Sequence, residues 1–332
     1  MSDRLTLTVA IPTFNRNADL CNCLESLSQQ TYSDFDVVIV NGGDAEGVVG
    51  VIEKFKKLRI KVVNQEKRGI IEARNLGWKS ANTDIVCLID DDLIVSKQWL
   101  ENIHSTFLSD DNIGGVSGPT IIPPERRKNR DLSFLLEGEI GIRGTLLDVF
   151  MGVYKRIVLE NKIYVVGQIL PSGAFTPGSN YEKCLELQDI IEVDYLEACH
   201  MCFRRLLFKK IGGFNDVYTG TGEWNEPEFA FKVKEIGYRL VFNPRAITEH
   251  HLSQGGVFIA RTNAYERSRN FINFYFSNIR LNNLNKLFRF GTNLIYINGY
   301  WCYKFVQTGN PDWLNGITGT IVGLVKEFLL WR

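Results

Sequence analysis

The sequence of 332 residues lacks any long uncharged apolar run. A helix needs about 18 or more such residues to cross a bilayer, so we expect no spanning helix. The chain also lacks an excess of either charge, because 38 Lys and Arg are matched by 38 Asp and Glu. A balanced charge argues against a nucleic-acid binder that depends on bulk positive charge, and we expect no nucleic-acid partner.

Three further signals are missing. No apolar secretory segment opens the chain, so we expect reduced thiols and a cytoplasmic location. The segment Cys199-His200-Met201-Cys202 has no second pair at matching spacing, which argues against a zinc knuckle. A Gly-x-Gly-x-x-Gly turn is absent after the first predicted strand, which disfavours a Rossmann dehydrogenase.

The first half of the chain alternates between strand and helix patterns. Apolar runs predict strands, and apolar residues at helical spacing predict helices between them. Such alternation predicts an α/β protein with a mainly parallel sheet covered by helices on both faces. The predicted strands are 5–11, 35–40, 60–64 and 84–89, and the predicted helices are 19–30, 48–58 and 69–80. All four strands then deliver their carboxyl ends to one edge.

The run "IVCLIDDDL", residues 85–93, places three carboxylates directly after a predicted buried strand. Asp90, Asp91 and Asp92 repel one another unless a cation or water compensates them. Two interpretations follow: a solvated acidic turn, or a divalent-cation site at the carboxyl edge of the sheet. Thr13 and Asn41 follow two other predicted strands and share that edge.

The second half is less regular. It contains a strand-like segment 192–204, a helix 226–237, a strand 238–242 and, from about residue 260, a helical region rich in aromatic residues. Six segments now follow one another in order, and together they resemble the family-2 glycosyltransferases with the GT-A fold over residues 5–255. The segments are "TVAIPTFNR" (8–16), "NQEKRGIIEARNLGW" (64–78), "LIDDDL" (88–93), "EVDYLEACHMCFRRLLFKKIGGFND" (192–216), "NEPEFAFKVKEIGYRLVFNP" (225–244) and "ITEHH" (247–251).

The resemblance implies a domain organisation. Residues 1–255 would form the GT-A catalytic domain, a Rossmann-like mainly parallel sheet flanked by helices. Within it, 1–118 would be the nucleotide-binding half and 119–255 the acceptor half. Residues 256–332 would be a helical C-terminal extension.

The resemblance also implies a metal site with Mn²⁺ or Mg²⁺. Asp92 would ligate the metal, Asp90 would face the nucleotide ribose, and Asp91 would join the nucleotide site. By the family's Pro-x-Ala-x-x-x-His spacing, His250 would be the second ligand, with His251 as its alternative. Such an ion stabilises the charge that grows on a departing nucleoside diphosphate.

The family's nucleotide pocket maps onto the loops after the predicted strands. The residues concerned are Pro12, Thr13, Asn15, Asn41, Gly69 and Arg74. Where the family often has Asp-Asp-Gly-Ser or Asp-Asn-Gly-Ser, this chain has Asn-Gly-Gly-Asp at 41–44. The departure leaves the base open, so UDP, GDP and dTDP sugars all stay candidates as donor.

An inverting transfer needs a base that takes the proton of the acceptor hydroxyl. The resemblance places Glu226 in that role, with Glu228 and Glu223 as alternatives, although Asn225 stands where the family commonly has Glu. On the acceptor side Ala198 replaces a common Gly, so we expect His200 to face the substrate.

The resemblance predicts an inverting transferase of cell-surface glycan biosynthesis that moves a sugar to a glycan or lipid-linked glycan. A polyprenyl-phosphate glycosyltransferase and a non-catalytic sugar-nucleotide-binding scaffold stay open as alternatives. The aromatic tail, with Trp331 and the residues at 300–303, has two interpretations. It either packs on the catalytic domain or mediates oligomerisation, or it rests peripherally on the cytoplasmic face of the membrane.

Overall fold

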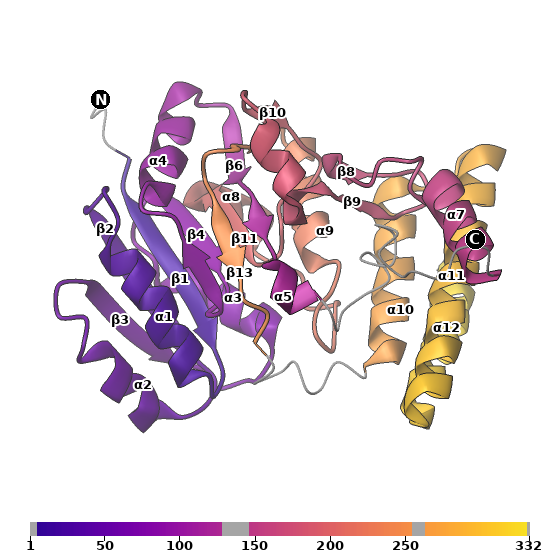
Figure 1. The fold of residues 1–332 in the computed structure, drawn as a ribbon, viewed down its shortest axis with the longest axis horizontal. Helices are drawn as coiled ribbons and strands as arrows, with labels where there is room; N and C mark the ends of the chain where they lie inside the picture. Colours follow the sequence, from indigo (N-terminus) through magenta and orange to yellow (C-terminus); the bar gives the residue numbers. More distant parts are fainter. Residues whose placement is uncertain (1–4, 128–145, 254–262, 331–332) are drawn as a thin grey trace.

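The computed structural model describes residues 5–127, 146–253 and 263–330. Its centre is an eight-stranded sheet in the order β10-β12-β6-β11-β4-β1-β2-β3 (Figure 1). Strands β4, β1, β2 and β3 run parallel, and so do β12 and β6, whereas β11 is antiparallel to both of its neighbours. The strands are β1 (Leu7–Thr13), β2 (Phe35–Asn41), β3 (Arg59–Asn64), β4 (Ile85–Ile89), β6 (Ile113–Ser117), β10 (Ile191–Glu192), β11 (His200–Arg204) and β12 (Arg239–Phe242). The predicted, mainly parallel α/β sheet is confirmed.

Helices cover both faces of this sheet because side chains alternate along each strand. Val9 and Ile11 of β1 belong to one apolar core, and Ala10 between them belongs to the other. The first core is completed by α1 (Asn17–Ser28), α2 (Ala45–Ile52) and α4 (Trp99–Ser109). The second is completed by α3 (Ile70–Ser80), α8 (Arg205–Ile211) and α9 (Asn225–Glu235).

Two predicted elements were wrong in extent. The helix predicted over 48–58 ends at Ile52, because the chain tightens there and turns Phe55 into the core, where it is buried. The strand predicted over 192–204 is divided into β10 and β11. Between them the backbone N–H of Asp194 donates to Gly167 O rather than to a sheet neighbour.

Two small sheets accompany the central sheet. The first is three-stranded, in the order β5-β13-β7, with β5 (Leu93–Val95), β13 (Thr248–His250) and β7 (Thr120–Ile121). In it His250 pairs with Leu93, so the end of β13 comes to lie beside the acidic run. The second is the hairpin of β8 (Val166–Ile169) and β9 (Phe175–Pro177).

Long helices lie at the opposite end of the molecule from β3 (Figure 1). They are α10 (Ala264–Phe274), α11 (Leu284–Thr308) and α12 (Asn315–Leu330), and α7 (Leu146–Val153) lies beside them. Shorter elements are α5 (Pro124–Arg127), η1 (Tyr154–Val158), η2 (Gly178–Asn180), η3 (Glu182–Glu186), η5 (Tyr275–Ile279) and η6 (Pro311–Leu314). In none of the described ranges is a helix both long enough and apolar enough to span a membrane.

Glycines allow α12 to pack closely against α10. A Cβ atom added to Gly319 would lie 2.2 Å from Tyr265 O, and one added to Gly323 would lie 2.9 Å from Cβ of Ile272. Two of the C-terminal helices are therefore packed tightly against each other. The predicted boundary between residues 255 and 256, like Trp331, lies outside the described residues.

Candidate active site

The acidic run after β4 is compensated by an arginine from the loop after β1. Arg16 contacts Asp91 Oδ1 at 2.7 Å through Nη2 and Asp92 Oδ2 at 3.1 Å through Nη1. Thr13 Oγ1 donates to the other oxygen of Asp91 at 2.7 Å. Burial raises the pKa of Asp91 to about 8, against the opposing effect of Arg16. Asp91 is fully buried. It joins the end of β1 and the loop after it to the acidic run, and its carboxylate is not exposed at the sheet edge.

Asp92 is held by a segment far away in the sequence. Its Oδ2 accepts the backbone N–H of Ser253 at 2.8 Å, and its Oδ1 lies 3.2 Å from Nε2 of His250. Burial opposes ionisation of Asp92, but the pKa is held below its usual range by His250, Arg16 and the Ser253 N–H. Burial by itself would lower the pKa of His250, yet the neighbouring Cys199 and Asp92 raise it overall.

Asp90, Asp92 and His250 form a candidate metal centre. One ligand atom from each lies within 4.8 Å of the others. Two carboxylate oxygens with one imidazole nitrogen suit Mn²⁺ or Mg²⁺, and the Asp92 carboxylate is held in place by the N–H and guanidinium groups described above. Asp90, predicted to face the ribose, therefore lies with the predicted ligands. His251, the alternative ligand, lies 3.4 Å from Glu249 Oε2 instead.

A cleft of about 690 Å³ extends from this centre across the sheet edge to α11. Most predicted site residues line it, namely Pro12, Thr13, Gly69, Arg74, Asp90, Asp92, Glu226 and His250. Gly69 precedes α3 with a φ of 134°, a conformation that favours glycine, and so lets the chain turn into α3 at the cleft wall.

Three predicted residues, Asn15, Asn41 and Asp91, are not on the cleft lining. The Asn41 amide donates to Asn64 Oδ1 at 3.0 Å and accepts the Gly43 N–H at 2.9 Å. Asn15 accepts the backbone N–H of Asp44 at 2.8 Å. Both amides thus shape the loops that carry the cleft-lining Gly42 and Thr13.

Glu226 lies at the start of α9 and forms an ion pair with Arg74. Arg74 also donates to the carbonyl of Ala198 at 3.0 Å, so one guanidinium joins α3, α9 and the segment before β11. The turn before Glu226 is strained, because Trp224 has a φ of 77°. Its indole stacks on Phe274 of α10, so one of the C-terminal helices holds this turn in place.

The two alternative bases have different surroundings. Glu223 lines the cleft and pairs with Arg267 Nε at 3.1 Å. Glu228 is buried, pairs with Lys232 Nζ at 2.6 Å and is not among the lining residues.

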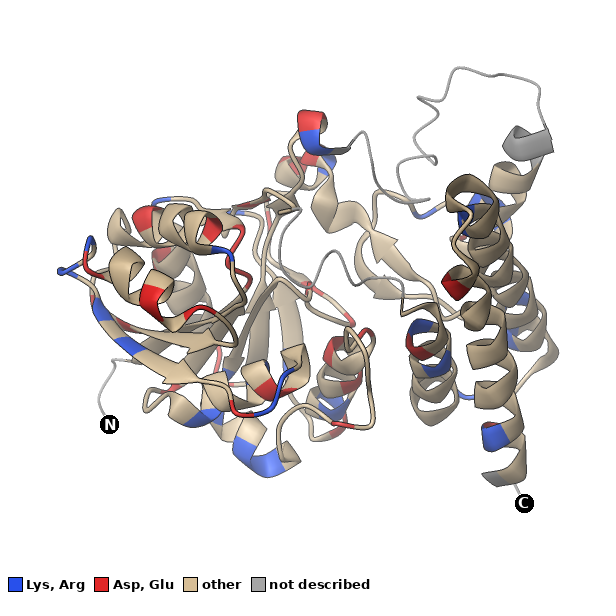
Figure 2. Cartoon of the chain, turned by 90° about the horizontal axis from the view of Figure 1, so that it is seen from below, with Lys and Arg blue, Asp and Glu red and all other residues tan. Residues whose placement is uncertain are grey.

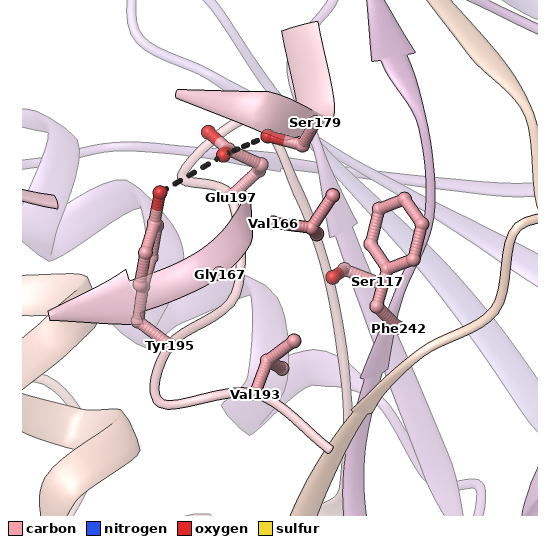
Figure 3. A pocket seen from close by; sticks show the side chains of 8 residues that line it. All are labelled: Ser117, Val166, Gly167, Ser179, Val193, Tyr195, Glu197 and Phe242. Carbon is pink, nitrogen blue, oxygen red and sulfur yellow. Dashed lines mark hydrogen bonds between the residues drawn. The ribbon is translucent and has the colours of Figure 1, made fainter. Parts of the chain in front are cut away.

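Sequence reasoning missed a further carboxylate, Glu197. It lines the cleft and an adjoining small pocket, where Ser179 and Tyr195 donate to the same carboxylate oxygen (Figure 3). Burial raises the pKa of Glu197, with the hydrogen bonds opposing this effect. Within the described ranges no Lys or Arg pairs with it. Tyr195 is two residues away along the chain, but only the fold brings Ser179 to Glu197, and no motif marks this carboxylate.

The expectation that His200 faces the substrate was wrong. His200 is fully buried in β11, where its Nε2 accepts the indole N–H of Trp99 at 2.8 Å. Burial lowers the pKa of His200 to about 3, so this residue is a neutral part of the core. The preceding residue, Cys199, lies just before β11 and lines the cleft instead.

A mainly parallel sheet flanked by helices, with a candidate metal centre at its carboxyl edge, matches the α/β fold of GT-A glycosyltransferases. Residues 8–162 match the family model "Glycosyl transferase family 2". This match confirms, over those residues, the resemblance to family-2 glycosyltransferases seen in the sequence.

Curated relatives match only part of their own length. An uncharacterized glycosyltransferase, YwdF of Bacillus subtilis, is 42% identical over 89 residues, which cover 26% of this chain and 33% of YwdF. The chondroitin synthase of Escherichia coli is 31% identical over 241 residues, which cover 70% of this chain and 32% of the synthase. The matched region therefore spans about a third of each of these relatives.

Solved structures agree in fold. The mannosyltransferase PcManGT from Pyrobaculum calidifontis, solved with GDP-Man and Mn²⁺, has a TM-score of 0.55 at 18% identity over 98% of this chain and 87% of its own. Staphylococcus aureus TarS 1–349, solved with UDP-GlcNAc, has a TM-score of 0.58 at 16% identity over 96% of this chain and 81% of its own.

Proposed function

We propose that the chain transfers a sugar from a nucleoside-diphosphate donor to an acceptor hydroxyl, with inversion at the anomeric carbon. One observation carries the proposal. The candidate metal centre and Glu226 line the same cleft, so the leaving diphosphate and the incoming hydroxyl are served from two walls of one cavity.

Asp90, Asp92 and His250 would hold Mn²⁺ or Mg²⁺. When bound there, such an ion neutralises charge that develops on the departing diphosphate. Arg16 fixes Asp92, and the Ser253 N–H fixes the same oxygen, so the carboxylate is pre-oriented for this task. The Mn²⁺ in the similarly folded mannosyltransferase supports the choice of metal.

The donor nucleotide would lie along Pro12, Thr13 and Gly69. The lining residues Arg16 and Arg68 place cations at this end of the cleft, which suits an anionic donor. UDP, GDP and dTDP sugars are the candidate donors, and the similar folds solved with GDP-Man and UDP-GlcNAc support this class.

Glu226 would accept the proton of the acceptor hydroxyl as the sugar is transferred. Its ion pair with Arg74 keeps the carboxylate in a fixed orientation toward the cleft. If the acceptor is instead a polyprenyl phosphate, it is already an anion and this base is dispensable.

A thermal-shift series tests the proposal. UDP, GDP, dTDP and CMP sugars are each added to the full chain with and without Mn²⁺. We expect one donor class to raise the melting temperature, and to do so more strongly with the metal. No shift with any donor would contradict the proposal, and a shift without any metal-dependent donor hydrolysis would favour the non-catalytic scaffold.

We extend the proposal to the setting of the enzyme: a cytoplasmic protein of cell-surface glycan synthesis, in peripheral contact with a membrane. All seven cysteines are unpaired, as is common in reducing compartments. On α12, Ile321, Val325 and Phe328 form one exposed apolar stripe. Figure 2 shows few charged residues on the C-terminal helices.

Co-sedimentation of the full chain with lipid vesicles, alongside light scattering, tests this setting. Binding to vesicles by a monomer supports membrane contact. A dimer that ignores vesicles would instead assign the stripe to homo-oligomerisation.

A further inference from the structure

The cleft extends beyond the proposed nucleotide site. It continues to a wall formed by the middle of α11, with Asn293, Tyr296, Ile297, Tyr300 and Trp301 on its lining. This helix begins at Leu284, far along the chain from the acidic run at 90–92, and lies outside the matched family region. The wall is therefore a feature of this chain's C-terminal helices rather than of the nucleotide-binding sheet.

Three polar side chains of this wall are hydrogen-bonded within the protein. Tyr296 donates its hydroxyl to the carbonyl of Phe150. Trp301 donates its indole N–H to Ser268 Oγ at 2.9 Å, and the amide of Asn293 donates to the carbonyl of Ser172 at 3.0 Å. These donors are thus unavailable to a ligand, and the wall offers mainly ring and aliphatic surface.

Further apolar residues adjoin this wall. Leu159 and Ala174 line the cleft and belong to one apolar cluster with Tyr296. A sugar chain would lose hydrogen bonds to water here without replacing them, at a cost in free energy. An apolar chain would instead gain by leaving water.

A cation lies where the apolar end meets the catalytic end. Arg267 of α10 lines the cleft, lies over the Trp301 ring at 5.3 Å and pairs with Glu223. An acceptor with an anionic link between an apolar chain and its reacting end would match this order of surfaces.

We propose that the α11 end of the cleft binds the apolar chain of a lipid-linked acceptor, with Ile297 and Tyr296 as its contact surface. The proposal rests on the proposed transferase function for the other end and selects one of its acceptor classes. The outer face of the same helix is also apolar: Leu284, Ile295 and Val306 are 82%, 66% and 80% exposed. A lipid surface beside that face would be a suitable source for such an acceptor.

Titration of the full chain with three soluble probes tests the inference. They are farnesyl phosphate below its aggregation limit, methyl phosphate as its chain-free counterpart, and maltopentaose. Trp224 and Trp301 line the cleft, so quenching of tryptophan fluorescence reports binding. We expect farnesyl phosphate to bind at least about tenfold more tightly than methyl phosphate, from burial of its chain.

Two matched variants locate the binding. Ile297→Asn alters the cleft wall and should weaken farnesyl phosphate about tenfold. Ile295→Asn makes the same change on the exposed face of the same helix and should leave this affinity unchanged. Melting temperatures of both variants and metal-dependent donor hydrolysis report that the fold and the catalytic end are intact.

Three results would overturn the inference: equal affinity for farnesyl and methyl phosphate, tight binding of maltopentaose alone, or equal weakening by both variants. If any of these occurs while donor hydrolysis persists, the proposed transferase function stands and only the lipid-linked acceptor falls. Loss of donor hydrolysis in the unaltered chain would overturn both.

Discussion

The two ends of the cleft are built in opposite ways. At the sheet end, Asp91 and Asp92 are buried and are compensated by Arg16 and by backbone groups. At the α11 end, Tyr296 and Trp301 are equally buried, but their polar atoms turn into the protein. The first end is pre-organised for charge and the second for apolar surface.

The difference shows how one cavity can serve a donor and an acceptor of unlike chemistry. Charged groups at the carboxyl edge of a sheet are fixed by short loops whose ends the strands hold rigidly. The apolar wall needs no such precision and is provided by helices packed on the outside. Trp224 connects the two, because it precedes Glu226, the proposed base, on α9 and stacks on Phe274 of α10.

The largest effect is expected from a substitution in the candidate metal centre at the sheet end. Asp92→Asn removes one charge from the candidate metal centre, and transfer should fall about a thousandfold, or about 4 kcal/mol in the barrier. Donor hydrolysis with increasing Mn²⁺ measures the effect. Asp111→Asn is the control, because Asp111 is fully exposed and far from the cleft lining; equal loss in both variants would refute a metal centre at Asp92.

Glu226→Gln tests the base and should reduce kcat about a hundredfold while donor binding persists. The change also leaves Arg74 without its ion-pair partner, so the melting temperature must be measured beside the rate. Glu235→Gln, at the exposed end of the same helix, is the matched control. Retained activity in Glu226→Gln would support an acceptor that is already an anion, such as a polyprenyl phosphate.

Arg16→Gln tests whether positive charge at the sheet end stabilises the fold. It removes the guanidinium that Asp91 and Asp92 share, and the free energy of unfolding should fall by about 2 kcal/mol. Since Mn²⁺ supplies positive charge at the same edge, it should stabilise the variant more than the unaltered chain. Urea titrations with and without Mn²⁺ measure both quantities, and an identical metal effect in the two proteins would count against the arrangement.

The smallest expected effect concerns the layer beneath the sheet end. Because burial lowers the pKa of His200 to about 3, unfolding takes up a proton as pH falls below the ordinary value of about 6.5. The stabilising contribution is therefore complete above about 6.5 and is lost toward acid pH. Between about pH 7 and pH 5.5 this loss should lower the free energy of unfolding by about 1 kcal/mol. His200→Gln should remove that slope, and equal slopes would contradict a neutral His200.

Much of the sheet end was predictable, for a local reason. The strand–helix alternation, the acidic run and the residue positions of the family pattern are continuous stretches of sequence. The apolar run over 85–89 therefore predicted a buried strand, with the carboxylates at its end. The predicted pairing of Asp92 with His250 needed only the order of motifs, and both residues lie in the candidate metal centre.

The predictions failed for residues whose position depends on tertiary contacts rather than on the local sequence. His200 carries no local sign that Trp99 will cover it, and the end of α2 depends on where Phe55 packs. Asn15 and Asn41 lie at the predicted loops, yet they turn their amides to neighbouring backbone and side chains. Whether these residues and Glu226 act in the reaction stays a prediction.

By itself the sequence determined the α/β sheet, the edge at which the acids gather and the resemblance to the family-2 glycosyltransferases. These follow from short-range periodicity and from the directions that parallel strands impose on their ends. Only the tertiary structure decided that Arg16 compensates those acids, that Glu197 faces the cleft and that α11 closes its far end. Such contacts join residues far apart in the chain, and their free energy depends on burial, which no local pattern specifies.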